Sequence, residues 1–250
     1  MSQQIRECLK NLNDQEWLDA IQNLLHNQTI NRVRVDMFFL MCRAIDQKLF
    51  SLVDWARTLI NFNELQIDDQ MRLLQNSWSK ILILDHIHQK MHNNLPDELL
   101  LPNEQKFDMM GMALLGVNTK ANKTNNMLSS LKKFSKVYNT MILLKFDFLD
   151  YVCLKIILLL DSAEVLLWNR QQIEESSEQV HASLKNHCRN CHPSVLGKYK
   201  ALMELLPYLR SMARTGEDFL NFKLMQGLAP QPNTLLAEML TVKRRSVECG

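Results

Sequence analysis

The chain has 250 residues, of which 46% are hydrophobic, and only six glycines and six prolines interrupt it. This length supports one large domain with a substantial core, and so few interruptions favour an all-helical one. The formal net charge of +2 excludes a general electrostatic attraction to nucleic acid. The longest apolar run, residues 156–160, is far below the roughly 20 residues of a membrane helix, and no secretion signal is recognisable. We therefore expect a soluble, intracellular protein without a membrane partner, whose six cysteines are free thiols.

Apolar residues recur at helical spacing through the first third of the chain. The expected helices cover residues 5–12, 17–25, 37–65 as one long helix or two abutting ones, and 68–91. Asp14 is placed to cap the second helix through its side-chain oxygen, and a polar connector follows at residues 27–34. Asp68 and Asp69 supply an acidic first turn to the fourth helix, which favours its N-terminus electrostatically.

The remainder of the chain begins with a short hairpin, predicted from strands at residues 99–101 and 104–107 around Pro102 and Asn103. The further expected helices cover residues 108–115, 126–144, 147–160, 164–191, 195–225 and 235–242. Pro207 falls inside the helix 195–225 and should bend it, because proline lacks a backbone donor. No repeat or second domain is recognisable, so we expect one domain over residues 1–250.

Ten residues between positions 55 and 78 stand in a fixed pattern of spacings. They are Trp55, Ala56, Arg57, Phe62, Leu65, Asp69, Gln70, Leu73, Leu74 and Trp78. This pattern resembles the signature of nuclear-receptor ligand-binding domains. The segments LVDWAR, ELQIDDQMRLLQNSW and ILILDH are similar to the fushi tarazu factor, steroidogenic factor and liver receptor homologue subfamily. The similarity continues through MCRAIDQKLFS, FDFLDYVCLK, PSVLGKYKALMELLP and LLAEML, and so covers nearly the whole chain.

The resemblance implies a fold and a function. The fold would be a layered antiparallel helical sandwich with one short hairpin, with N-terminal helices and a connector in residues 1–34 and a C-terminal activation helix in residues 234–245. The function would be nuclear transcription regulation, in which a monomeric domain recruits an LxxLL-containing coactivator or a homeodomain-type partner without added ligand. DNA would be bound only by a zinc-finger domain that this sequence lacks, so we expect a fragment of a longer protein. No phosphate loop or nucleophile elbow suggests an enzyme.

The docking site implied by the resemblance is an apolar slot with opposite charges at its two ends. Arg57 would hold the carbonyl end of an LxxLL helix and Glu238 its amide end, as the helix dipole requires. The slot would be lined by Val53, Ile67, Met71, Leu74, Leu235 and Met239. Leu235 and Met239 lie 40° apart on one helical face, so this pair could face the peptide while Leu236 and Leu240 dock on the domain. On spacing alone, a simple amphipathic helix packed on the core is the alternative.

A phospholipid is the ligand that the resemblance suggests, held by a tyrosine, a lysine four residues later and a glycine amide. The matching positions are Phe219 and Lys223, and the loop 117–126 contains no glycine, so two of the three contacts have no counterpart. An apolar stripe opposite three lysines could fill the lipid's volume instead; it comprises Met127, Leu128, Leu131, Phe134, Val137 or Tyr138, and Met141. We predict a small or filled pocket without a cofactor. The alternatives are a phospholipid-regulated domain and, for the stripe, ordinary core packing.

Two motifs resemble metal or haem sites. The run from Cys188 to His192 has the C-x-x-C-H pattern of covalent haem attachment, and its two cysteines could also suggest redox or zinc chemistry. Haem attachment needs an exported chain and a structural zinc site needs a second ligand pair, so we expect neither. His88 and His92 share a helical face near His86, but no carboxylate pattern beyond Asp85 accompanies them. We expect no metal site in this chain.

Overall fold

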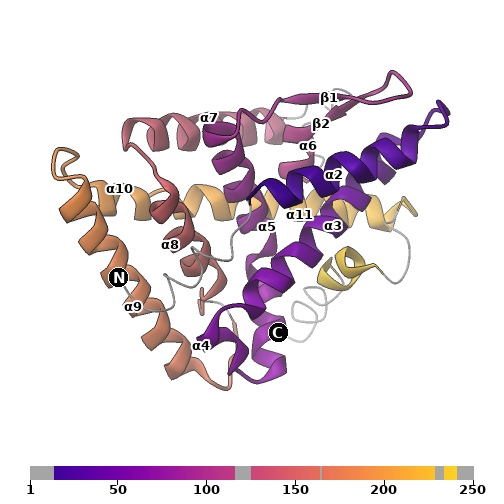
Figure 1. Ribbon diagram of the computed structural model, residues 1–250. Coiled ribbons are helices and arrows are strands. Elements are labelled where there is room, and N and C mark those ends of the chain that lie inside the picture. The colour runs from indigo at the N-terminus through magenta and orange to yellow at the C-terminus, as the bar shows by residue number, and fades with distance from the viewer. Residues whose placement is uncertain (1–13, 116–124, 164, 229–233, 241–250) are drawn as a thin grey trace.

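A computed structural model describes residues 14–115, 125–163, 165–228 and 234–240. Helix α5 (Ile67–His92) runs through the interior and is covered on several sides (Figure 1). It contacts α3 (Met37–Arg57), α6 (Met109–Ala113), α8 (Phe148–Leu159) and α11 (Leu206–Met225). All of its side chains between residues 73 and 89 are buried except that of Asn76. Because α5 is enclosed in this way, a polar side chain that it carries is costly to bury unless it has a partner inside the protein.

The outer helices pack on those that surround α5. They are α2 (Asp14–Thr29) on α3, α7 (Asn125–Leu143) on α11 and α9 (Arg170–Cys191) on α8, with the short α4 (Ile60–Asn63) after α3 and α10 (Lys198–Met203) against α9. Strands β1 (Glu98–Leu100) and β2 (Lys106–Asp108) pair antiparallel, with Leu99 opposite Phe107. This arrangement confirms the predicted all-α layered sandwich with one hairpin. None of the described helices is both long and apolar enough to cross a membrane.

A buried ion cluster joins α3, α5 and α8. The Asp85 carboxylate lies 2.7 Å from the Lys48 ammonium and 3.1 Å from that of Lys155, and it accepts a hydrogen bond of 2.8 Å from the Tyr151 hydroxyl. Burial alone would raise the pKa of Asp85, but the charges of Lys155 and Lys48 lower it to about 2. The three helices are therefore tied together by a carboxylate that stays ionised in the core.

Two predicted helices are each divided in the structure. The region 37–65 forms α3 and α4 as two abutting helices, because the Thr58 hydroxyl and backbone N–H both bond the Trp55 carbonyl and end α3. The prediction of one bent helix over 195–225 is wrong: α10 ends at Met203 and α11 starts at Leu206. Pro207 stands in the first turn of α11, where its missing donor costs nothing, so it starts a helix and does not bend one.

Other boundaries differ by a few residues. Helix α2 extends four residues beyond the predicted end into the polar connector, and Asp14 is itself helical and not the preceding cap. Helix α9 starts at Arg170 and not at residue 164, because the Asp69 carboxylate accepts hydrogen bonds from the backbone N–H groups of Trp168 and Asn169. These donors are satisfied outside a helix. The predicted helix 5–12 lies outside the described residues.

Candidate functional site

The turn between α3 and α5 is built by the signature residues. Phe62 and Leu65 are buried beneath it, and the Gln70 side-chain amide donates to the backbone carbonyls of Leu65 at 2.9 Å and Asn63 at 3.3 Å. Buried Asp69 accepts the two backbone donors ahead of α9. The signature residues thus have a mainly structural role. They fix the turn from α3 to α5, and thereby the direction in which the end of α3 points.

Trp55 connects this turn to the buried ion cluster. Its ring is buried, and the Lys155 ammonium lies 4.6 Å from the ring centroid, a distance typical of a cation–π contact. Lys155 also pairs with Asp85. The end of α3 is therefore anchored to α8 by this cation–π contact, and the same ammonium ties α8 to α5 through Asp85.

One face of α3 leads directly to Arg57. At 100° per residue, Asp46, Phe50, Val53 and Arg57 fall within an arc of about 60°. Phe50 is 52% exposed and Val53 is partly buried, while Arg57 is exposed and forms no ion pair with another described residue. This face carries an anion at one end, apolar side chains in the middle and a cation at the other end. We call it the α3 stripe.

The C-terminal helix, residues 235–240, docks at the anionic end of the α3 stripe (Figure 1, yellow). The Leu236 backbone N–H donates to the Asp46 carboxylate at 2.9 Å, and the Ala237 N–H donates to the Thr234 hydroxyl at 3.2 Å. Both acceptors satisfy donors that the first helical turn would otherwise leave unpaired, and the Asp46 charge also favours the positive helix end. The structure therefore brings the C-terminal helix and α3 together across 190 residues of sequence.

The side chains predicted to line the slot differ in exposure. Ile67 is 64% exposed, and Val53, Met71 and Leu235 are partly buried. Leu74 and Met239 are buried, at 3% and 1% exposure. We call the eight predicted residues the docking surface; they are Arg57, Glu238, Val53, Ile67, Met71, Leu74, Leu235 and Met239. The buried pair can contribute only to its floor.

The C-terminal helix was expected to turn Leu235 and Met239 toward the peptide and to dock Leu236 and Leu240 on the domain, and the structure differs at Met239. Met239 is buried together with Leu236 and Leu240, while Leu235 is partly exposed and Glu238 is exposed. The three buried residues span an arc of about 100°, and Leu235 lies at its edge. The face that the domain covers is therefore wider than the spacing of Leu236 and Leu240 alone indicated.

Asp46 and Phe50 were missed by the sequence interpretation. The i, i+4, i+7 spacing of Asp46, Phe50 and Val53 was a signal that could have placed both residues on the face of Arg57. By contrast, no local sequence pattern predicts that Asp46 caps a helix far along the chain.

The interior side of α7 agrees with most of the predicted stripe. Phe134, Val137 and Met141 are buried, and the Phe134 ring meets that of His86 on α5 edge-on at 5.8 Å. Leu128 is 49% exposed, so its inclusion was wrong: it stands 120° around the helix from Phe134. Leu131 and Tyr138 are partly buried, whereas the Met127 side chain lies outside the described residues.

The predicted lipid-contact positions lie on α11. The Lys223 ammonium stands 5.5 Å from the centroid of the Phe219 ring, so phenylalanine offers this lysine a π face and no hydroxyl. Most of the loop 117–126 lies outside the described residues. Between α3 and α5, beside Lys48 and Asp85, a cavity of about 10 Å³ has room for one water at most.

The histidines of α5 have aromatic partners. His88 stacks on Tyr151 with ring centroids 3.9 Å apart, and its ring lies 4.7 Å from that of His92. His86 is buried, and neither of its ring nitrogens has a hydrogen-bond partner among the described residues. Burial lowers the pKa of His86 to about 4, with nearby Lys90 acting in the same direction and Asp97 opposing. None of the four described cysteines, which include Cys188 and Cys191, forms a disulfide with another described residue.

Comparisons with known proteins identify the family of this chain. The family model described as the ligand-binding domain of nuclear hormone receptor matches residues 26–225. Nuclear hormone receptor FTZ-F1 of Drosophila melanogaster is 43% identical over 245 residues, which cover 98% of this chain and 23% of that receptor. Nuclear receptor subfamily 5 group A member 2 of Rattus norvegicus is 36% identical, over 96% of this chain and 42% of that receptor. This chain thus spans less than half of either relative.

The fold has a close match among solved structures. The crystal structure of the ligand-binding domain of Fushi tarazu factor 1 of Drosophila melanogaster superposes with a TM-score of 0.90 at 43% identity. The match covers 97% of this chain and 96% of that one.

Proposed function

This chain belongs to the nuclear hormone receptors, as a ligand-binding domain of the FTZ-F1 and steroidogenic factor type, and we propose that it recruits LxxLL helices at the docking surface. The observation that carries the proposal is the contact of the C-terminal helix with Asp46, on the α3 face that ends at Arg57. The partner would be a coactivator or a homeodomain-type protein. Recruitment would regulate transcription in the nucleus, and DNA contacts would belong to another part of a longer receptor.

The dimensions of the α3 stripe support this proposal. Arg57 follows Asp46 by eleven positions, which corresponds to about 16 Å along the helix axis. A peptide helix of two to three turns is about 11–16 Å long and therefore fits between the C-terminal helix and Arg57. Its leucines would contact partly exposed apolar side chains such as Val53 and Met71, whose burial drives such complexes.

The order of charges supports the same orientation of the peptide. Glu238 belongs to the helix that docks at the Asp46 end, and Arg57 lies at the opposite end of the α3 stripe. An LxxLL helix presents unpaired N–H groups at its start and unpaired C=O groups at its end. Glu238 would accept from the former and Arg57 would donate to the latter. The cap that seats the C-terminal helix, Asp46, belongs to this chain itself, and we propose that recruitment needs no added ligand.

The test is peptide binding by fluorescence anisotropy with a labelled LxxLL peptide and purified, lipid-stripped protein. Arg57→Ala and Glu238→Ala should each weaken binding by about 1 to 3 kcal/mol, or roughly 5- to 150-fold, because each removes a charged hydrogen-bond partner. Arg34→Ala is the matched control, since Arg34 is exposed at the other end of α3. A peptide with its leucines replaced by alanine should not bind.

Unchanged affinity in both charge variants would contradict the docking surface. Binding that appears only after a lipid is added would contradict ligand-independent recruitment, while leaving the surface itself in place.

For the interior, we propose that α7 fills the space where a lipid would sit. The buried face of Phe134, Val137 and Met141 and the loss of a tyrosine hydroxyl at Phe219 support this proposal. A phospholipid-regulated domain is the alternative, for which Lys223 would supply the phosphate contact. Native mass spectrometry of the purified protein distinguishes the two: the filled interior predicts the mass of the chain alone, and one co-purifying phospholipid per chain would contradict it.

A further inference from the structure

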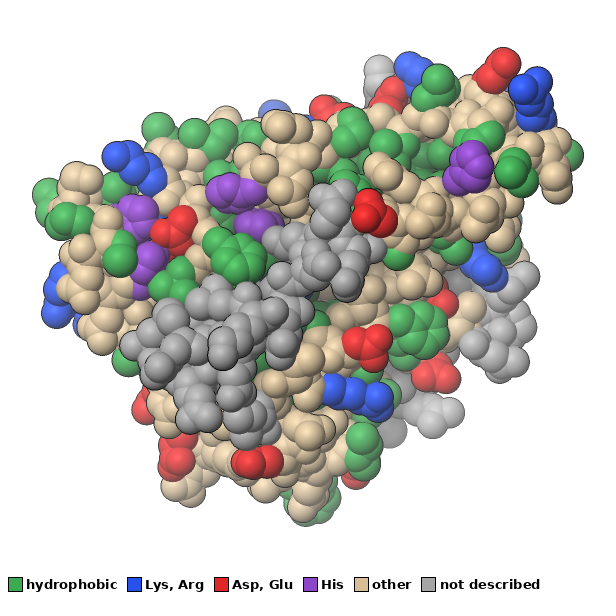
Figure 2. Space-filling model, in the orientation of Figure 1, with side chains coloured by type: hydrophobic (Ala, Val, Ile, Leu, Met, Phe, Trp, Pro, Cys, Tyr) green, Lys and Arg blue, Asp and Glu red, His purple; other side chains and the backbone are tan. Residues whose placement is uncertain are grey.

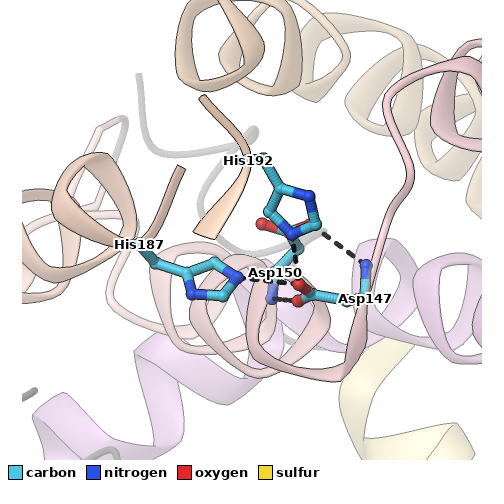
Figure 3. A group of neighbouring side chains, drawn as sticks. All are labelled: Asp147, Asp150, His187 and His192. Atoms are coloured by element: carbon cyan, nitrogen blue, oxygen red, sulfur yellow. Dashed lines mark hydrogen bonds and ion pairs between the residues drawn. The ribbon is translucent and has the colours of Figure 1, made fainter. Parts of the chain in front are cut away.

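Two histidines and an aspartate converge where the start of α8 meets the end of α9 (Figure 3). The Nε2 atoms of His187 and His192 each lie 2.7 Å from the same Asp147 oxygen, Oδ2. Figure 2 shows histidine side chains gathered with an acidic one on the face over α8 and α9. The docking surface uses none of these residues, so the cluster needs a separate explanation.

The Asp147 carboxylate is held in place by its own helix. Asp147 is the N-cap of α8: its Oδ1 accepts from the Asp150 backbone N–H at 2.9 Å, and its own N–H donates to Asp150 Oδ2 at 3.0 Å. Asp150 is fixed in turn by an ion pair of 2.6 Å with fully buried Lys198. One oxygen of Asp147 therefore serves the cap, and the other is left to the two histidines. Asp150 supports the cluster but is already occupied by its own partners.

The histidines are held by the end of α9. His187 stands one turn before the end of the helix, and His192 is the residue that caps it, followed directly by Pro193. Their rings lie nearly perpendicular, with centroids 5.3 Å apart. Donors that are fixed by secondary structure need little further ordering to bind an ion.

The cluster is open to ions and water. The side chains of His187, His192 and Asp147 are 12%, 17% and 35% exposed. Burial raises the pKa of Asp147, but the Asp150 backbone N–H and the two histidines lower it to about 2, so this ligand is anionic at neutral pH. Water can complete the coordination shell from the exposed side.

We propose that Asp147, His187 and His192 form a binding site for a divalent transition-metal ion of the zinc type. Two imidazoles and one carboxylate, with a fourth position open to water, match the donor set that Zn²⁺ takes, whereas Ca²⁺ and Mg²⁺ prefer oxygen ligands. At about 2.0–2.1 Å from each ligand atom, tetrahedral geometry needs those atoms about 3.3 Å apart. Side-chain rotations would have to open the two 2.7 Å separations, and all candidate ligand atoms of the cluster already lie within 4.8 Å of one another.

Metal binding requires the Nε2 protons of both histidines to move. Without metal, each Nε2–H donates to Asp147, whereas a metal ion needs the Nε2 lone pair. A neutral histidine therefore changes tautomer so that Nδ1 carries its proton, and a protonated histidine releases one proton to water. Only N–H bonds change, and no bond between heavy atoms of the chain is broken. The ion would link the first residue of the α8 cap to the end of α9, which is a stabilising role and revises the expectation of no metal site.

The experiment uses the chain after removal of metal with a chelator, followed by ZnCl2 titration with melting temperature and calorimetry as readouts. At a free metal concentration one hundred times the dissociation constant, the melting temperature should rise by about 5–10 °C. His187→Gln and His192→Gln retain a side-chain donor toward Asp147 but lose the imidazole, and each should weaken binding at least tenfold. His26→Gln, an exposed histidine on α2, is the matched control.

Three outcomes would overturn the site. They are no metal-dependent shift in the wild-type chain, a shift that survives both glutamine variants, and a shift that Cys191→Ser removes while the glutamine variants keep it. Co²⁺ provides a readout that needs no variant, since a thiolate-to-cobalt charge-transfer band would assign the ion to a cysteine. LxxLL peptide affinity should be the same in His187→Gln as in the wild-type chain, so this test and that of the docking surface fail independently.

Discussion

Asp85 and Asp147 each bring two basic side chains onto one carboxylate, but in opposite surroundings. Asp85 lies in the core between α3, α5 and α8 and pairs with two buried lysines. Asp147 lies at the partly exposed junction of α8 and α9 and pairs with two histidines. Lysine remains charged at neutral pH and cannot ligate an ion in that state, whereas neutral histidine can. The Asp85 cluster is therefore suited to holding three helices together, and the Asp147 cluster to binding an ion from solution.

The largest expected effect is the loss of stability when the carboxylate of the buried cluster, Asp85, is removed. Asp85→Asn removes the buried carboxylate that pairs with both Lys48 and Lys155, and should lower the free energy of unfolding by about 3–5 kcal/mol. Urea denaturation at pH 7 measures this loss. Asp97→Asn is the control, because the exposed Asp97–Lys90 pair should contribute less than about 1 kcal/mol. If both variants lost the same free energy of unfolding, burial would not be the reason that the Asp85 cluster stabilises the fold.

His86 sharpens the comparison, as a buried histidine without a carboxylate partner. Its unfolded-state pKa near 6.5 exceeds its folded-state pKa of about 4. Between these two pH values the unfolded chain therefore binds a proton at His86 that the folded chain does not bind. Stability from His86 is complete above pH 6.5 and is lost as the pH falls toward 4, by about 2 kcal/mol between pH 7.5 and pH 5. His86→Leu should remove this part of the pH dependence, as urea denaturation at both pH values would show. A wild-type slope retained in the variant would contradict the assignment.

The smallest effect concerns Asp147, the partly exposed carboxylate. Asp147→Asn retains a good helix cap, so the metal-free chain should lose less than about 1 kcal/mol of stability. The same variant removes the anionic ligand, and the rise in melting temperature with ZnCl2 should disappear. Thermal denaturation with and without metal gives both values. A loss as large as that of Asp85→Asn would mean that the two clusters play the same structural role.

Local chemistry explains which elements were predictable. Helical spacing and the acidic or capping residues located most helices and the hairpin, because these signals act within one or two turns. The errors at Pro207 and at residues 164–169 have different sources. A proline is compatible with a bend or with a new helix start, and only the division at Glu204 and Leu205 decided between them. The start of α9 depended on Asp69, about one hundred residues away.

The candidate site was predictable to the extent that it repeats a known pattern. The ten signature residues led to Arg57, and the resemblance at LLAEML led to Glu238. The exposure of each slot residue was not predictable, because it depends on how the C-terminal helix is seated. Met239 illustrates this: its spacing from Leu235 suggested a shared face, yet the structure buries it with Leu236 and Leu240.

By itself, the sequence determined the receptor family, the all-helical class and the approximate positions of most helices, since each follows from short-range spacing or from a contiguous signature. Tertiary structure alone decided that Asp46 caps the C-terminal helix, that Asp85 gathers two lysines, and that Asp147 meets two histidines. Each of these contacts joins residues dozens to nearly two hundred positions apart. The packing of whole helices sets such distances, and no local periodicity encodes them.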